Sequence, residues 1–259
     1  MTKPLFEKYA DDYASSRPGY PSEIKDFLYH KFCSGPCAVY LDVACGTGIF
    51  TQLMAPEGCA NPTPEGPSCM GIDWSLSLLK AGCDFYGGFG FMPVCARGEK
   101  LPIKSSSCDL VTIAQGFHWM HRHDSLAEIY RILKPGAGIS LIWYRRKDLT
   151  KPHQAYVENL TRHYNPNYDP KFMDADYVGM LIADGRFTDI GQKRFYGSKT
   201  YDLETYIKWQ RSKSFIGDAM EPDLLDEFLV KVEQNIPTFF PDGVIVEEFK
   251  YDVVWGRKV

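Results

Sequence analysis

The chain has 259 residues, a formal net charge of −4 at pH 7 and a hydrophobic share of 44%, values of an ordinary globular protein with a sizeable core. No run approaches the ~18 consecutive apolar residues of a membrane-spanning helix, and the first residues lack the apolar segment of a signal peptide. We therefore expect a cytoplasmic protein with no membrane partner, and the acidic balance argues against nucleic acid as a partner.

Hydrophobic periodicity predicts helices and strands that alternate along the chain. Helices are expected around 4–14 and 24–32, separated by Arg17-Pro18-Gly19-Tyr20-Pro21. Strands are expected at 39–44, 70–72, 91–97, 109–114 and 139–144, with a helix capped by Asp124 before the last of these. Short helices in 150–185, helices at 203–210 and 222–232, and a long strand at 245–255 complete the prediction. Such alternation indicates a parallel sheet with helices on both faces.

The segment 39–48 runs from an apolar strand into a turn of small residues that contains Ala44, Gly46 and Gly48. Small residues let a backbone lie close against a ligand. A dinucleotide fingerprint requires glycine where Thr51 stands, and a phosphate-binding loop requires lysine after its last glycine, so neither motif is present. Asp42 would repel a phosphate and attract an ammonium group. The turn therefore predicts a ligand with an adenosine half and an amino-acid half.

This turn resembles the first motif of class I S-adenosylmethionine-dependent methyltransferases, Glu/Asp-x-Gly-x-Gly-x-Gly, with Ala44 in place of the first glycine. Residues 6–145 resemble the small-molecule group of trans-aconitate and ubiquinone-pathway-like enzymes, through segments 17–21, 96–102, 114–119 and 128–136. The resemblance implies a Rossmann-like α/β fold, whose seven-stranded, mostly parallel sheet has an antiparallel last strand and a helical lid. It also implies S-adenosylmethionine as cofactor and a small-molecule methyl acceptor.

The chain is expected to consist of four parts with different roles in binding the cofactor and the acceptor. Residues 1–38 would close the cofactor site, and 39–148 would form the cofactor-binding core. Residues 149–240 would form the lid with strand six, and 241–259 would supply the final strand.

Two residues at the end of the second strand are candidates for the nucleoside part of the cofactor. Asp73 is expected to accept hydrogen bonds from both ribose hydroxyls, with a plain helix cap as the alternative. Trp74 is expected to cover the adenine edge, or else to be a surface aromatic residue.

The resemblance implies further cofactor contacts. Gly98 and Glu99 would hold the adenine through their backbone, since Arg97 stands where the family has an acidic residue. Gln115 would contact the methionine part. Tyr13 and Arg17 would close over the cofactor, with Arg17 near its carboxylate, which an arginine can bind bidentately.

Residues after strands four and five are candidates for the acceptor site. His118 and Trp119 would lie at the methyl-transfer pocket, or else pack behind strand four. Arg145-Arg146-Lys147 is either a solvated charge run or a clamp for an acidic substrate, to which Arg211 and Lys213 would add.

The acceptor decides whether a catalytic base is needed. A carboxylate is already ionised at pH 7, whereas a hydroxyl or amine must lose a proton, for which His118 is the candidate catalytic residue. We hypothesise a carboxylate acceptor, and keep a hydroxyl, amine or protein acceptor and a non-catalytic cofactor-binding protein as alternatives. No metal site is predicted, because His118, His121, His123 and Asp124 lack the i, i+4 spacing of paired ligands on a helix.

Overall fold

The structure is a computed structural model that describes residues 6–33, 38–55, 69–146, 150–169 and 175–259. The chain divides into two compact units. One, here named the sheet unit, comprises Gly19–Tyr144, Asp176–Phe195 and Tyr251–Val259. The other, the helical unit, comprises Met1–Pro18, Arg145–Ala175 and Tyr196–Lys250. Each is described by itself.

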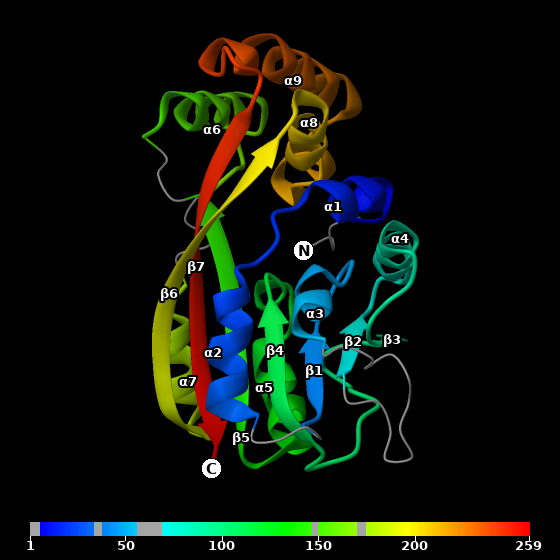
Figure 1. Ribbon diagram of the computed structural model, residues 1–259, viewed down its shortest axis with the longest axis vertical. Helices are drawn as coiled ribbons and strands as arrows, with labels where there is room; N and C mark the ends of the chain where they lie inside the picture. Colours follow the sequence, from blue (N-terminus) through cyan, green and yellow to red (C-terminus); the bar gives the residue numbers. More distant parts are fainter. Residues whose placement is uncertain (1–5, 34–37, 56–68, 147–149, 170–174) are drawn as a thin grey trace. The chain divides into compact units, whose positions relative to one another are not determined.

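The described residues form a seven-stranded sheet in the order β3-β2-β1-β4-β5-β7-β6. Its strands are β1 (Tyr40–Val43), β2 (Cys69–Asp73), β3 (Met92–Cys95), β4 (Cys108–Ala114), β5 (Leu133–Arg146), β6 (Phe187–Tyr201) and β7 (Ile245–Lys258). The first five pair in parallel, and β7 runs opposite to β5 and β6 (Figure 1). This confirms the predicted mostly parallel sheet with an antiparallel last strand.

Helices lie on both faces of the sheet unit, with α2 in front of the sheet and α5 and α7 behind it in Figure 1. Its helices are α2 (Ser22–Phe32), α3 (Ile49–Met54), α4 (Leu76–Tyr86), α5 (Arg122–Ile132) and α7 (Tyr177–Asp184). All four residues of β1 and all five of β2 are buried, as expected for strands covered on both sides. Gly138 of β5 admits the ring of Phe32 from α2, because a Cβ there would come within 2.2 Å of it.

The helical unit contains α1 (Ala10–Ser16), α6 (Pro152–Tyr164), α8 (Leu203–Arg211) and α9 (Pro222–Asn235), with a π-helical turn at Ser214–Asp218. The amphipathic spacing that predicted helices at 203–210 and 222–232 therefore identified two of them. In the described part of the chain, no helix is long and apolar enough to cross a membrane.

One predicted boundary is wrong. Asp124 does not cap α5, which begins at Arg122 with His121 as its N-cap. Asp124 lies in the first turn, where its carboxylate is 2.9 Å from His121 Nδ1. Aspartate is favourable as an N-cap and also in the first turn of a helix, which attracts negative charge. The residue type alone therefore did not distinguish the N-cap from the first turn.

Candidate active site

The turn between β1 and α3 has the backbone that the sequence predicted for close approach. Gly46 and Gly48 have φ of 59° and 79°, and Ala44 has φ of 57°. The Gly48 N–H donates to the Cys45 carbonyl over 2.9 Å, and the Cys45 N–H donates to Ile72 of β2 over 3.0 Å. The turn is thus fixed against the carboxyl end of the neighbouring strand, where ligands bind in parallel α/β sheets.

Ala44, which replaces the first glycine of the motif, is accommodated by Gly116 after β4. A Cβ on Gly116 would lie 2.5 Å from the Ala44 Cβ, so only glycine fits there while alanine stands at 44. Gln115, the residue before Gly116, also has a left-handed backbone, with φ of 61°. Non-glycine residues rarely adopt this region, and each costs on the order of 1 kcal/mol. The two adjacent strand ends therefore both carry strain at the predicted site.

Asp73 connects the end of β2 to the glycine turn. Its Oδ2 accepts a hydrogen bond from the Gly46 N–H and its Oδ1 accepts one from the Ser75 N–H, each at 2.8 Å. Burial raises the pKa of Asp73, and these backbone donors oppose the shift. Ser75, not Asp73, is the N-cap of α4, accepting from the Leu78 N–H over 3.3 Å. Each Asp73 oxygen retains a lone pair, so the carboxylate can still accept from a ribose diol.

Asp42 lies beneath the turn and is fully buried. The hydroxyl of Thr51 donates to its Oδ2 at 2.6 Å, and that of Thr112 donates to its Oδ1 at 2.7 Å. Burial raises the pKa of Asp42 to about 7, although both hydroxyls oppose the shift. The carboxyl group thus joins β1, α3 and β4, and its contact with a ligand ammonium stays a prediction. Sequence reasoning missed this role of Thr51 and Thr112, although any buried carboxylate needs such donors.

The turn also contains a buried polar atom without a partner. Thr47 Oγ1 is buried and accepts or donates no hydrogen bond among the described residues. Gly82 of α4 packs against the Thr47 carbonyl so closely that a Cβ would come within 2.2 Å of it. A left-handed glycine turn, a carboxylate at the next strand end and an unused hydroxyl fit a nucleoside-containing cofactor such as S-adenosylmethionine.

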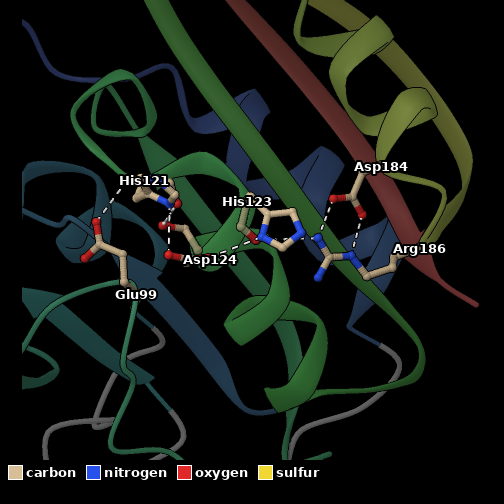
Figure 2. Close-up of polar contacts among 7 residues, drawn as sticks. Glu99, His121, His123, Asp124, Asp184 and Arg186 are labelled. Carbon is tan, nitrogen blue, oxygen red and sulfur yellow. Dashed lines mark hydrogen bonds and ion pairs between the residues drawn. The ribbon is translucent and has the colours of Figure 1, made fainter.

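The predicted adenine-binding residues follow β2 and β3. Trp74 is 36% exposed. Gly98 lies against Met120 and Val43, and a Cβ there would approach the Met120 Cε within 2.0 Å. The Glu99 Oε1 accepts a hydrogen bond from the His121 N–H at 3.0 Å, which commits this side chain to the start of α5 (Figure 2). Contact of Gly98 and Glu99 with an adenine through the backbone stays a prediction.

The residues after β4 include the candidate base. The Gln115 Nε2 donates to the Tyr144 carbonyl at 3.0 Å. The His118 ring lies 4.8 Å from the Trp119 ring, and Trp119 is 43% exposed. Burial, with repulsion from Arg122, lowers the pKa of His118 to about 4. His118 is therefore neutral at pH 7 but a weak base, below the range that favours general base catalysis.

The other histidines of this region make surface contacts. Asp124 lies 2.9 Å from His121 Nδ1 and 3.2 Å from His123 Nδ1, and Arg186 pairs with Asp184 beside them (Figure 2). Over the ranges that the structure describes, no three His, Cys, Asp or Glu side chains are grouped to hold a metal ion.

Four predicted site residues belong to the helical unit. The Arg17 guanidinium lies 4.3 Å from the Tyr13 ring centroid, and its Nη2 donates to the Ser212 carbonyl at 2.6 Å. The Arg146 Nη2 donates to Glu158 at 3.0 Å, while Arg145 is half-buried. Lys147, the third residue of the basic run, lies outside the described residues. Their roles toward cofactor and acceptor stay predictions.

Comparison with known proteins finds a match to a methyltransferase family over part of the chain. Residues 41–141 match the family model of a methyltransferase domain. An uncharacterized methyltransferase-like protein of Schizosaccharomyces pombe is 28% identical over 213 residues, which are 82% of this chain and 78% of that protein. A ubiquinone/menaquinone biosynthesis C-methyltransferase of Cupriavidus necator is 34% identical over 121 residues, covering 45% of this chain and 48% of the enzyme.

The fold agrees with this match. The structure of an inferred type II methyltransferase from Anaeromyxobacter dehalogenans superposes with a TM-score of 0.66 at 13% identity, covering 93% of this chain and 97% of the other. The matched residues 41–141 contain the glycine turn, Asp73 and the strand ends described above. Residues 41–141 thus match a methyltransferase domain, and the described sheet has the Rossmann-like fold of the superposed structure.

Proposed function

We propose that this chain is an S-adenosylmethionine-dependent methyltransferase that methylates a small molecule on a carboxylate. The observation that carries the cofactor is the Asp73 carboxylate, fixed by the Gly46 and Ser75 N–H groups at 2.8 Å. A carboxylate preorganised at the end of β2, beside a left-handed glycine turn, is suited to bind a ribose diol. The small-molecule part is supported by the quinone-pathway name of the Cupriavidus necator relative.

The residues of the chain would bind and orient the reactants. Asp73 would accept hydrogen bonds from the ribose hydroxyls. Gly46 and Gly48 would let the backbone of the turn lie close to the cofactor, and Gln115 would contact the methionine part. Tyr13 and Arg17 would add contacts to the amino-acid end. When bound, S-adenosylmethionine supplies a methyl group already activated by its sulfonium centre. Alignment then contributes most of the rate, since the methyl group needs no further activation.

A carboxylate acceptor agrees with the chemistry of the candidate base. His118, with its pKa lowered to about 4 by burial, would remove a proton from a hydroxyl or amine only poorly. A carboxylate has no proton to lose at pH 7. Arg145 and Arg146, at the end of β5, supply positive charge for binding an acid. A hydroxyl, amine or protein acceptor, and cofactor binding without catalysis, are the competing outcomes of the tests below.

Binding of S-adenosylhomocysteine, measured by calorimetry, tests the cofactor. The wild type should bind at micromolar concentration, and Asp73→Ala should weaken binding at least tenfold, because the ribose hydroxyls lose their acceptor. Asp84→Ala is the matched control, since Asp84 is an exposed carboxylate on α4. Equal affinity in the wild type and in Asp73→Ala, or no binding at all, would refute the proposed cofactor site.

Methylation of a panel of small acids, alcohols and amines then tests the acceptor. Transfer of a labelled methyl group to acids, with formation of a base-labile ester, is the expected result. Transfer only to alcohols or amines would replace the carboxylate assignment. Tight cofactor binding with no transfer to any acceptor class, peptides included, would favour a non-catalytic binding protein.

A further inference from the structure

The helical unit contains a buried polar group built around α8. Gln210 is 0% exposed and Lys213, just after the helix, is 6% exposed. The Lys213 Nζ donates to the Gln210 Oε1 at 2.6 Å and lies 3.9 Å from the centroid of the Trp209 ring. Full burial of a lysine is rare in proteins and calls for a compensating partner.

Three buried hydrogen-bond donors in and beside this group are unused in the described part of the chain, one of them the indole Nε1 of Trp209. The other two, the Gln210 Nε2 and the Arg146 Nη1, are buried and have no hydrogen-bond partner among the described residues. The bond from Lys213 fixes the orientation of the Gln210 amide, because only the carbonyl oxygen can accept from an ammonium. The Gln210 NH2 therefore points away from Lys213. On Arg146, Nη2 is engaged by Glu158 at 3.0 Å, which leaves Nη1.

The nearby carboxylates do not serve these two donors. Glu247 accepts from the Tyr206 hydroxyl at 3.1 Å and from Gln154, and the His153 Nε2 lies 3.5 Å from its Oε1. Glu158 also accepts from Arg162 at 3.2 Å and from the Tyr168 hydroxyl at 3.2 Å. Neither acid accepts a hydrogen bond from the Arg146 Nη1 or the Gln210 Nε2, and buried N–H groups without a partner are costly to a fold.

The two cationic side chains beside the unused donors, Arg146 and Lys213, repel each other. Burial, followed by repulsion from Arg146, lowers the pKa of Lys213 well below its usual value. Burial raises the pKa of Glu247, but His153, Arg146 and Lys213 outweigh it and leave that pKa below its usual value. These mutual effects show that Arg146, Lys213 and Glu247 lie within electrostatic range of one another. An added anion would offset the repulsion between the two cations.

We propose that the Arg146 Nη1 and the Gln210 Nε2 bind a carboxylate of the methyl acceptor, with Lys213 holding the Gln210 amide in position. The inference rests on the proposed function, and it assigns the acid-binding role to Arg146 together with a glutamine and a lysine from a distant segment. A planar carboxylate offers two oxygens, one for each donor, and the charge-assisted bond to arginine is the stronger of the two. Arg146 and Gln210 are binding residues, and Lys213 is a positioning residue.

The test is the direct binding of probe acids to the full chain. Calorimetry measures the affinity for acetate, succinate and citrate. Succinamide, which lacks the charges of succinate, is the neutral control, and inorganic phosphate is the alternative anion. Arg146→Lys keeps the charge and the pairing with Glu158 but loses the planar fork. Gln210→Met removes the amide donor at similar volume. Arg162→Lys is the matched control, because Arg162 also pairs with Glu158 but its side chain is 51% exposed.

At least one acid should bind, and succinamide should not. Arg146→Lys and Gln210→Met should each weaken acid binding about tenfold, a change of about 1.4 kcal/mol, while Arg162→Lys leaves it within twofold. Lys213→Met should weaken acid binding by a smaller factor, because Gln210 keeps its donor but loses its fixed orientation. Affinity for S-adenosylhomocysteine should be unchanged in all four variants.

Three results would overturn the inference. The first is that no acid binds to a chain that binds S-adenosylhomocysteine. The second is that acids bind equally to the wild type, Arg146→Lys and Gln210→Met. The third is tighter binding of phosphate than of any acid, with the same sensitivity to Arg146→Lys, which would assign the donors to another anion. Failure of S-adenosylhomocysteine binding with intact acid binding would instead refute the proposed cofactor.

Discussion

The two units differ in the hydrogen-bond partners of some of their buried polar groups. In the sheet unit, both oxygens of Asp42 and both of Asp73 accept hydrogen bonds from the protein itself. In the helical unit, the Arg146 Nη1 and the Gln210 Nε2 are buried without a partner among the described residues. The sheet unit thus holds carboxylates in a preorganised frame, whereas the helical unit holds donors that require an additional acceptor.

This difference separates two ways of building a site. Asp42 and Asp73 stand at the ends of β1 and β2 and are fixed by residues of adjoining strands and of the turn. The donors of the helical unit come from the end of β5 and from the end of α8, and Glu247 opposite them comes from β7. Substitution of the fully buried Asp42 should therefore act mainly on stability, whereas substitution of Arg146 or Gln210 should act mainly on ligand binding.

The largest effect is expected from Asp42→Asn, through the pH dependence of stability. The pKa of Asp42 is raised from 3.8 to about 7 by burial, so the folded chain binds the extra proton more tightly than the unfolded chain. The stabilising contribution is complete below pH ~4 and is lost as the pH rises through about 7. Asparagine does not titrate. The stability of Asp42→Asn relative to the wild type should therefore rise by about 3 kcal/mol between pH 5 and pH 8.

Urea unfolding at several pH values measures this difference. Asp109→Asn is a suitable control, since Asp109 is a partly exposed carboxylate paired with Lys134. A stability difference between Asp42→Asn and the wild type that does not change with pH would show that the buried carboxyl group does not titrate as described.

The next effect concerns the strained strand ends of the sheet unit. Gly116→Ala would place a Cβ 2.5 Å from that of Ala44, and we expect a loss of about 2 kcal/mol in the free energy of unfolding. Ala44→Gly removes both the opposing methyl group and the left-handed strain of a non-glycine residue. The double variant should therefore regain most of the stability lost in Gly116→Ala.

A double-mutant cycle of urea midpoints measures the coupling between positions 44 and 116. Additive losses, with no recovery in the double variant, would show that the two strand ends do not constrain each other. Gly19→Ala serves as a control for the glycine effect itself, since no atom lies within 4 Å of a Cβ built at that position and its backbone is not left-handed.

The contrast between the units also explains what the sequence could predict. The glycine turn and Asp73 are recognisable because one strand and the turn after it are continuous in the chain, and parallel strands end at one edge of the sheet. The partners of Asp42 were not recognisable, since Thr112 is 70 residues away and its hydroxyl has no motif of its own. Arg146 and Lys213 were named from charge alone, but nothing in the local pattern of 203–211 singled out Gln210. The start of α5 was misplaced because an aspartate is favourable both as an N-cap and in the first turn of a helix.

A smaller effect, of opposite sign, is expected in the helical unit. Burial lowers the pKa of Lys213, so its ammonium form is less favourable in the folded chain than in the unfolded one, and stability is lost as the pH falls. Lys213→Met removes this charge at similar length, and we expect a gain of about 1 kcal/mol at pH 7. Lys208→Met, at a surface pair with Glu204, should leave the stability nearly unchanged, because exposed ion pairs contribute little. Destabilisation by Lys213→Met in urea unfolding would mean that the buried charge is structural and that the two units do not differ in this respect.

The smallest effect is expected at His118 of the sheet unit, because a carboxylate acceptor needs no base. With its pKa lowered to about 4, mainly by burial, the His118 ring is neutral between pH 6 and pH 9. If the acceptor is a carboxylate, His118→Gln should change kcat by less than about threefold, because no proton is transferred, whereas loss of a general base typically costs 10²-fold or more. The pH profile of kcat/KM should likewise show no inflection near pH 6.5 that the variant removes. An inflection of that kind, together with a hundredfold loss of kcat, would make His118 the base for a hydroxyl or amine acceptor, and a residue of the sheet unit would then take part in the proton transfer itself.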